Sequence, residues 1–463
     1  MYQGPGKKEM AEERHVMNIL YKKLTQTQII VIGYLLIILM GSLFLMLPIS
    51  SRSGEVTSFG DALFTATSAA CVTGLVVRDT WYHWSLFGQV VVLALIQVGG
   101  MGFMTLGVYM AILLRRKIGL RIRGILQESI NSLQIGGIVK LAKKIMKGTL
   151  IFESVGAVLL MIRFVPEYGA LRGIWYGIFH SVSAFCNAGF DLMGGKYGKY
   201  SSLTCYEGDF LVNVTIMTLI AIGGIGFFVW DDLSIHKLNW KKYRLHTKIV
   251  LSTTVVLILS GAALFYLAER ENVFSGMTVP EKILGSLFQS VTARTAGFNT
   301  TDTGVLTEGG KFLTMLLMFI GGSPGSTAGG IKTTTLVVLL VSVRANLRQM
   351  AGCNVYNRRL DESTIRKASV VLCTNLFLAV TAVLILEVVQ PLPLADVMFE
   401  VFSAIGTVGM STGITRELGQ VPRVILIFLM FCGRIGSLTF ALSLRGHKHE
   451  PPVKQPVEQI TIG

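Results

Sequence analysis

The sequence predicts an all-α polytopic membrane protein with four pseudo-repeats around a central pore. Each pseudo-repeat consists of a span, a re-entrant pore helix and a second span. The 463 residues are 51% hydrophobic and only 15% charged, whereas soluble proteins carry about 25% charged residues. Several segments also reach the roughly 20 apolar residues needed to cross hydrocarbon. Finally, a short helix–turn pattern recurs four times between longer apolar segments.

The recurring pattern is a Phe followed nine or ten residues later by a Gly, with Ser or Thr between them. One such pattern is a weak signal, but four in matching register predict a fourfold lining around an ion path. The four pairs are Phe64 and Gly74, Phe179 and Gly189, Phe288 and Gly297, and Phe399 and Gly409.

Apolar runs and their breaks give the elements in order, with eight spans and four re-entrant helices. Repeat 1 (27–114) has spans at 27–47 and 86–114 around a re-entrant helix at 61–75. Repeat 2 (148–236) has spans at 148–165 and 209–230 around 173–190. Repeat 3 (237–343) has a span at 249–268, a re-entrant helix at 281–298 and an interrupted span at 312–343. Repeat 4 (368–445) has spans at 368–389 and 421–444 around 395–410.

The remaining segments are polar and basic. They are an N-terminal arm (1–26), connectors at 115–147 and 344–367, and a tail (446–463). Because Lys and Arg concentrate in loops on the cytoplasmic side, we expect both termini in the cytoplasm and the four turns on the outer side. The predicted location is the inner or plasma membrane. The net charge of +15 is spread over these loops, which argues against nucleic-acid binding.

Glycine-rich clusters at 98–102, 222–226, 320–323 and 432–436 lie in the last span of each repeat. Small residues at such spacing let helices approach closely. We therefore interpret these clusters as sites of helix packing.

The four turns have the composition of a cation filter. A dehydrated cation needs inward carbonyl oxygens, and Gly allows the backbone conformation that presents them. The turns contain no Asp or Glu, which favours a monovalent ion. The candidate filter residues are Val72, Thr73, Gly74, Asn187, Ala188, Gly189, Thr295, Ala296, Gly297, Thr407, Val408 and Gly409.

The break in repeat 3 is a second candidate site. A proline kink would be the ordinary interpretation, but ten consecutive small or helix-breaking residues predict a mobile intramembrane loop that could plug the path. Lys332 lies just after the loop, and we expect it near the inner mouth of the path as part of the gate. The loop residues are Gly321, Gly322, Ser323, Pro324, Gly325, Ser326, Thr327, Ala328, Gly329 and Gly330.

Arg434 stands alone in an apolar span. A charged side chain inside a membrane span costs free energy and usually has a function. The alternative is a structural pairing of Arg434 with Glu153 or Glu387. Arg294, which borders the third turn, carries less weight in this interpretation.

The turns and the span–turn–span order over about 27–444 resemble the Trk/Ktr/HKT superfamily of potassium uptake proteins. Because no extra hairpin precedes the first repeat, the chain is most similar to the KtrB-type membrane subunit. The resemblance implies that Gly74, Gly189, Gly297 and Gly409 are central filter glycines, that the loop gates the pore, and that Arg434 places a fixed positive charge in it.

The resemblance also implies a homodimer on a cytoplasmic RCK-type ring that binds ATP or ADP. The transported ion would be K⁺, with Na⁺ as a candidate modulator and no covalently bound cofactor. The rival hypothesis is a secondary transporter with alternating access, but such proteins usually have inverted repeats. An enzyme is not expected, because the sequence has no catalytic constellation, and the six scattered Cys indicate neither a disulfide framework nor a zinc site.

Overall fold

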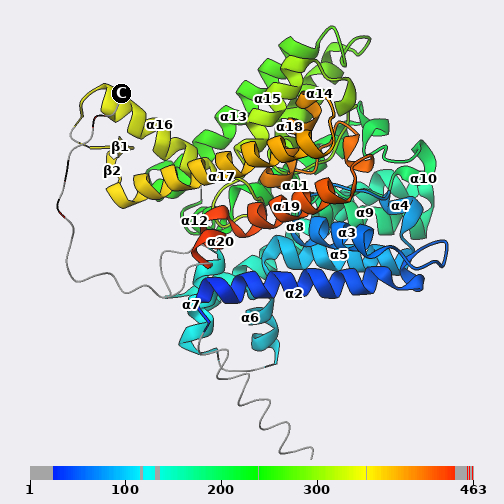
Figure 1. Cartoon of the computed structure of the whole chain (residues 1–463), viewed down its shortest axis with the longest axis horizontal. Helices are drawn as coiled ribbons and strands as arrows, with labels where there is room; N and C mark the ends of the chain where they lie inside the picture. Colours follow the sequence, from blue (N-terminus) through cyan, green and yellow to red (C-terminus); the bar gives the residue numbers. More distant parts are fainter. Residues whose placement is uncertain are drawn as a thin grey trace, which may run out of the picture.

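The computed structural model describes residues 24–114, 118–130, 136–237, 239–350 and 352–443, with the single residues 456, 458 and 461. Most of the predicted arm (1–26), most of the tail (446–463) and parts of the connector 115–147 lie outside these residues. The described chain is mostly helical, as the all-α class predicts (Figure 1).

Four described helices are long and apolar enough to cross a membrane, and each opens one predicted repeat. They are α2 (Gln26–Met46), α8 (Ile138–Tyr168), α13 (Leu245–Glu269) and α17 (Glu362–Val389). Their flanks expose large apolar side chains: in α2, for example, Met40 is 56% and Leu43 61% exposed. Such flanks suit a hydrocarbon environment rather than water.

The last span of repeats 1, 2 and 4 is bent, so the expectation of one continuous span there is wrong. The paired helices are α5 (Leu86–Met101) with α6 (Phe103–Leu113), α11 (Phe210–Ile225) with α12 (Phe227–His236), and α19 (Gln420–Ile435) with α20 (Ser437–Ser443). The bends measure 93°, 93° and 97°. Each break is a single Gly with positive φ: Gly102 (+77°), Gly226 (+94°) and Gly436 (+95°). Other residues resist this conformation, so the last Gly of each cluster turns the chain.

The first Gly of three clusters confirms the expected close packing. An ideal Cβ atom would lie 2.1 Å from the carbonyl oxygen of Ala70 at Gly99, 2.1 Å from that of Phe185 at Gly223, and 2.2 Å from that of Ile405 at Gly433. These carbonyls belong to the short helices described next, so the glycines let the bent helices lie directly against them.

Four short helices carry the recurring Phe of the sequence. They are α3 (Phe59–Ala70), α9 (Ala170–Phe185), α14 (Val279–Thr292) and α18 (Leu394–Gly406). The matched residues Phe64, Phe179, Phe288 and Phe399 are all 0% exposed. The recurring Phe of the sequence is therefore a core anchor in every repeat.

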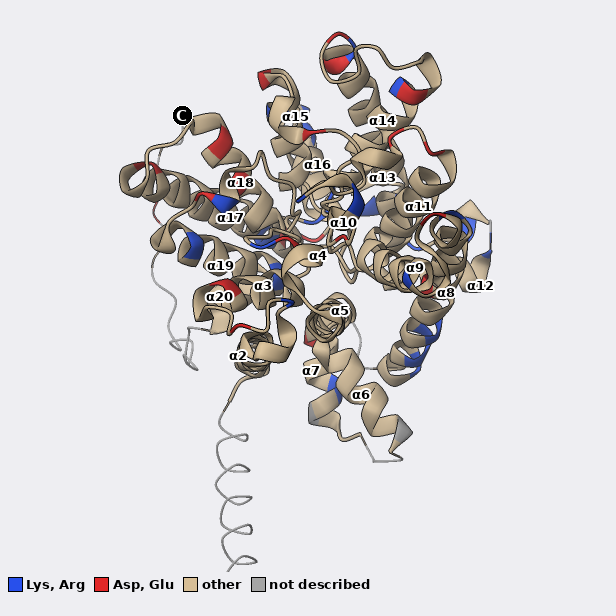
Figure 2. Cartoon of the chain, turned by 90° about the vertical axis from the view of Figure 1, so that its right-hand side faces the viewer, with Lys and Arg blue, Asp and Glu red and all other residues tan. Residues whose placement is uncertain are grey.

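The other elements connect these helices. They are η1 (Pro48–Ser50), α4 (Thr80–His83), α7 (Leu120–Ile130), α10 (Gly194–Tyr197), η2 (Thr204–Tyr206), η3 (Trp240–Lys242), η4 (Thr303–Val305), α15 (Glu308–Phe319), α16 (Thr333–Leu347), β1 (Asn354–Val355), β2 (Arg358–Arg359) and η5 (Ile414–Arg416). The strands form an antiparallel hairpin in the connector 344–367. Helix α8 starts ten residues before the predicted span, and its Lys residues gather at the end near α6 and α7 (Figure 2).

Candidate functional site

The structure brings the four glycine turns together in a closed cycle. Each glycine lies so close to the next turn that a Cβ atom could not be accommodated, because real Cβ atoms essentially never approach another heavy atom within 3.0 Å. In cyclic order, an ideal Cβ at each glycine would meet a carbonyl oxygen of the next turn: Gly74 that of Ala188 at 2.4 Å, Gly189 that of Ala296 at 2.6 Å, Gly297 that of Val408 at 2.4 Å, and Gly409 that of Thr73 at 2.0 Å.

Every turn has the same backbone signature, with positive φ at the central Gly and at the residue two positions before it. The φ values are +56° and +95° at Val72 and Gly74, +60° and +68° at Asn187 and Gly189, +77° and +81° at Thr295 and Gly297, and +50° and +91° at Thr407 and Gly409. Non-glycine residues in this region are costly and cluster at functional sites. Four such residues in matching positions indicate that the conformation is required.

Each turn is tied back to its own short helix by a hydroxyl residue that the sequence analysis did not single out. In repeats 1 and 4 the hydroxyl accepts a hydrogen bond: Gly74 N donates to Ser68 Oγ at 3.0 Å and Gly409 N to Ser403 Oγ at 3.1 Å. In repeats 2 and 3 the hydroxyl donates: Ser183 Oγ to Phe190 O at 2.8 Å and Thr292 Oγ1 to Phe298 O at 2.6 Å. The Ser or Thr within the recurring motif was the available signal.

The twelve predicted filter residues are buried, apart from Gly409, which is half-buried. The hydroxyl oxygens of Thr73 and Thr407 have no hydrogen-bond partner among the described residues. Orphaned polar atoms are uncommon in protein interiors, and these two could serve as ligands for a cation. The turns also begin at the C-terminal ends of the short helices, which carry partial negative charge. The site therefore favours positive charge without a carboxylate.

The predicted loop 321–330 lies beside the fourth turn, between α15 and α16. Its two ends pair through a bridge between Ile320 and Ile331. An ideal Cβ at Gly329 would lie 2.0 Å from Thr407 Oγ1, so the loop contacts the turn directly. On its other side, Ser323 N donates to Gly224 O at 3.0 Å. The loop is thus packed between the fourth turn and α11.

The two charges assigned to gating both bind backbone carbonyls. Lys332 Nζ donates to Ala328 O at 2.7 Å and to Gly329 O at 3.3 Å, within its own loop. The guanidinium of Arg434 donates to Thr327 O in the loop, and to Gly99 O and Gly100 O at the end of α5. Arg434 therefore joins the loop to a different repeat.

The carboxylate partner considered for Arg434 is wrong. No ion pair involves Arg434 in the part of the chain that the structure describes. Glu153 instead accepts a hydrogen bond from Gln97 Nε2 at 3.1 Å. Among the described residues, the direct partners of the Arg434 guanidinium are backbone carbonyls.

A cavity of about 340 Å³ adjoins the loop. Its lining includes Ser326, Lys332 and Arg434, together with Tyr34 of α2 and Glu128 of α7. An ion that passes the loop would enter a space lined by both positive and negative groups.

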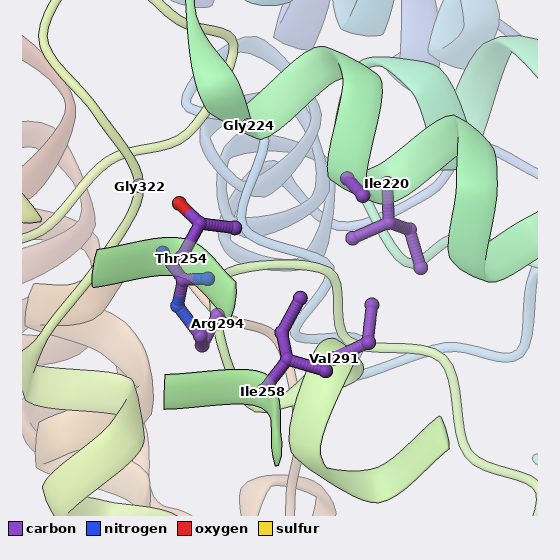
Figure 3. A pocket seen from close by; sticks show the side chains of 8 residues that line it. Ile220, Gly224, Thr254, Ile258, Val291, Arg294 and Gly322 are labelled. Carbon is purple, nitrogen blue, oxygen red and sulfur yellow. The ribbon is translucent and has the colours of Figure 1, made fainter. Parts of the chain in front are cut away.

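Arg294 has a larger structural role than the sequence suggested. Its side chain is only 7% exposed, and Nη2 donates to Gly321 O at 3.5 Å. It lines a small cavity of about 20 Å³ with Thr254, Ile258 and Val291 (Figure 3). Both Arg294 Nε and Thr254 Oγ1 lack a partner among the described residues. A buried guanidinium thus lies between the third turn and the start of the loop.

Comparisons with known proteins show which family and which fold the chain shares. The family described as "TrkH: Cation transport protein" matches residues 13–450. Potassium/sodium uptake protein NtpJ of Enterococcus hirae is 40% identical over 450 residues, covering 96% of this chain and 98% of the relative. Ktr system potassium uptake protein B of Bacillus subtilis is 41% identical over 427 residues, covering 92% and 94%.

The potassium transporter TrkH from Vibrio parahaemolyticus, a solved structure, superposes with a TM-score of 0.71 at 20% identity, covering 91% of this chain and 85% of that one. This likeness shows a shared fold. The predicted resemblance to the Trk/Ktr/HKT superfamily is confirmed, as is the expectation that the chain is not an enzyme, because the matched family consists of transport proteins. The chain therefore belongs to the TrkH family of cation transport proteins.

Proposed function

We propose that this chain is the channel-like membrane subunit of a potassium uptake system, with one selectivity filter built from its four turns. The observation that carries the proposal is the closed cycle of Gly74, Gly189, Gly297 and Gly409, each against a carbonyl of the next turn. Each proposed pseudo-repeat consists of a span, a short helix and a second span, and the four pseudo-repeats surround the cycle of glycines.

The chemistry of the turns favours a monovalent cation. Backbone carbonyls can replace the water shell of K⁺, and the twelve turn residues supply carbonyls without any Asp or Glu. The relatives NtpJ and Ktr protein B are named for potassium uptake, and NtpJ for sodium as well. K⁺ is thus the proposed substrate and Na⁺ a candidate modulator. Uptake would follow the membrane potential, which contributes about 2.3 kcal/mol per charge for each 100 mV.

The loop 321–330 is the proposed gate. It contacts the fourth turn through Gly329, and Arg434 holds it to α5 through Thr327 O. Displacement of the loop would open the way from the turns to the cavity of about 340 Å³. Lys332 and Arg434 keep positive charge at this point, which would slow permeation and exclude other cations.

The distribution of basic residues sets the proposed orientation. The Lys-rich start of α8 and the connectors would face the cytoplasm, together with both termini. The resemblance further suggests a homodimer with a pore in each subunit. A cytoplasmic RCK-type ring that binds nucleotide would contact the connectors and the gating loop.

The decisive test compares K⁺ and Na⁺ uptake in a strain without its own systems, for the unaltered chain and for Gly297→Ser. A side chain at Gly297 would meet Val408 O at 2.4 Å, so we expect the variant to lose K⁺ preference. The matched control is Gly276→Ser, because Gly276 has a similar φ of +84° but nothing within 4 Å of an ideal Cβ. Equal ion preference in all three proteins would overturn the filter assignment.

The rival transporter mechanism predicts a different flux. A channel-like subunit should pass K⁺ into proteoliposomes with no proton or sodium gradient imposed. If K⁺ moved only when a second ion gradient was present, the protein would be a coupled transporter and not a channel-like subunit.

A further inference from the structure

Each short helix carries a buried polar residue directly after its matched Phe. The four residues differ in chemistry, and their exposed fractions are 1% for Thr65, 0% for His180, 1% for Gln289 and 0% for Glu400. Because the position is equivalent in all four repeats, its chemistry can be compared within one chain.

At this position Glu400 binds the segment that leaves the fourth turn. Its Oε2 accepts a hydrogen bond from Thr415 Oγ1 at 2.7 Å, and its Oε1 accepts one from Ser411 Oγ. The two hydroxyl oxygens lie 3.0 Å apart, and Gly413 N donates to Ser411 Oγ at 2.8 Å. One carboxylate thus organises 411–415, which starts two residues after Gly409.

His180 has a corresponding contact in repeat 2. Leu192 N donates to His180 Nε2 at 3.2 Å, and Leu192 follows Gly189 by three residues. His180 Nδ1 lies 2.7 Å from Tyr176 O and must donate to it, since Nε2 is the acceptor. In the cycle of glycines, repeats 2 and 4 are opposite each other.

The equivalent residues of repeats 1 and 3 make no such contact. Thr65 Oγ1 donates to Asp61 O within its own helix. Both polar atoms of Gln289 lack a hydrogen-bond partner among the described residues. Anchoring at this position is therefore confined to one diagonal of the cycle.

Glu400 differs from His180 because a carboxylate can accept hydrogen bonds while it is ionised, whereas His180 must be neutral for Nε2 to accept from Leu192 N. No Lys, Arg or His nitrogen lies within 4.0 Å of its carboxylate in the described part of the chain. Its direct partners are two neutral hydroxyls, and hydrogen bonds to a charged acceptor are stronger than neutral ones. The carboxylate can therefore hold the following segment firmly.

We propose that Glu400 is a positioning residue for ion selectivity, which fixes the fourth turn through Ser411 and Thr415. This inference rests on the proposed filter. With 411–415 held by two hydrogen bonds, the carbonyls of the turn keep the spacing that suits K⁺. Without them, the turn can contract around the smaller Na⁺.

The test measures K⁺ uptake in competition with Na⁺ in proteoliposomes, for Glu400→Gln and Thr415→Val. Glu400→Gln keeps the shape and removes the charge, whereas Thr415→Val removes one donor and keeps the carboxylate. We expect the K⁺/Na⁺ preference to fall about 10- to 150-fold in each, the range that corresponds to one charge-assisted hydrogen bond. In the double variant the loss should be less than the product of the two, since both changes remove one interaction.

The matched control is Gln289→Met, which alters the equivalent position in repeat 3, where the side chain makes no hydrogen bond to a described residue. It should keep the preference of the unaltered protein. A merely structural role would lower total uptake in proportion to folded protein and leave the ion preference unchanged, and that result would overturn the proposal. If Glu400→Gln does not fold, an unchanged preference in Thr415→Val overturns it equally.

The outcomes also separate this inference from the proposed function. If Gly297→Ser loses K⁺ preference while Thr415→Val and Glu400→Gln keep it, only the role of Glu400 fails. If Gly297→Ser also keeps its preference, the filter assignment fails with it.

Discussion

Replacing Arg434 by Met should raise K⁺ flux, because the loop 321–330 would lose its connection to the rest of the site. Of the three carbonyls that Arg434 binds, only Thr327 O belongs to the loop, while Gly99 O and Gly100 O belong to α5. The variant therefore removes a tether between two elements and leaves the glycine turns untouched.

The size of the effect follows from the tether. A hydrogen bond from a charged donor contributes about 1.5–3 kcal/mol. Its loss would raise the ratio of displaced to seated loop by about 10- to 150-fold. If the seated loop limits permeation, flux should rise about tenfold or more, until passage through the turns becomes limiting.

The assay is K⁺ uptake into proteoliposomes at a fixed membrane potential, normalised to the amount of folded protein. Lys332→Met is the matched control. This substitution also removes a basic side chain, but the described partners of Lys332 are carbonyls of its own loop. It should raise flux less than Arg434→Met. Equal flux in Arg434→Met and the unaltered protein would refute the tether, and equal gains in the two variants would mean that charge alone limits permeation.

Two further predictions concern stability. Gly226→Ala should lower the melting temperature in detergent more than Gly276→Ala. The reason is that an ideal Cβ at Gly226 lies 2.8 Å from Pro324 O, whereas an ideal Cβ at Gly276 has nothing within 4 Å. An equal loss in the two variants would show that the loop moves to make room for the Cβ at Gly226. Arg294→Met should raise the melting temperature relative to Arg294→Lys, because Met removes the buried positive charge whereas Lys keeps one, and the guanidinium makes a single long hydrogen bond within the described part of the chain. A lower melting temperature for Arg294→Met would indicate a stabilising partner for the guanidinium.

The short helices and their turns could be predicted from the sequence because a single local rule generates them. A Phe must be buried, a Ser or Thr must reach the turn, and a Gly must lie where no Cβ fits. The structure places Phe288 in the core and Gly297 against the next turn. Each requirement leaves a residue type at a fixed position.

The bent helices could not be predicted from hydropathy. The residues before and after Gly102 are equally apolar, so the hydropathy of the segment gives no indication of the 93° bend. The conformation of one residue decides it, and a Gly in a span is also compatible with a straight, closely packed helix. Gly99 and Gly102 illustrate both outcomes within four residues.

The partners of Arg434 were hidden for a different reason. Acidic side chains can be identified in a sequence, so Glu153 and Glu387 were the natural candidates for an ion pair with Arg434. Every residue has a backbone carbonyl, so the sequence does not indicate which carbonyls would accept a hydrogen bond from Arg434. The three acceptors of Arg434 include carbonyls 334 and 335 residues away in the chain. Only the tertiary fold brings them within reach.

The contact of Gly409 with Thr73 has a consequence for biosynthesis. Membrane chains emerge from the ribosome N-terminus first. The turn that contains Thr73 is therefore made before repeat 4, which supplies its neighbour Gly409. During that interval the carbonyl of Thr73 has no fourth turn beside it, in a solvent that offers no hydrogen bond. A nascent polypeptide halted before α18 would lack the fourth turn, and the cycle of glycines would stay open at this contact.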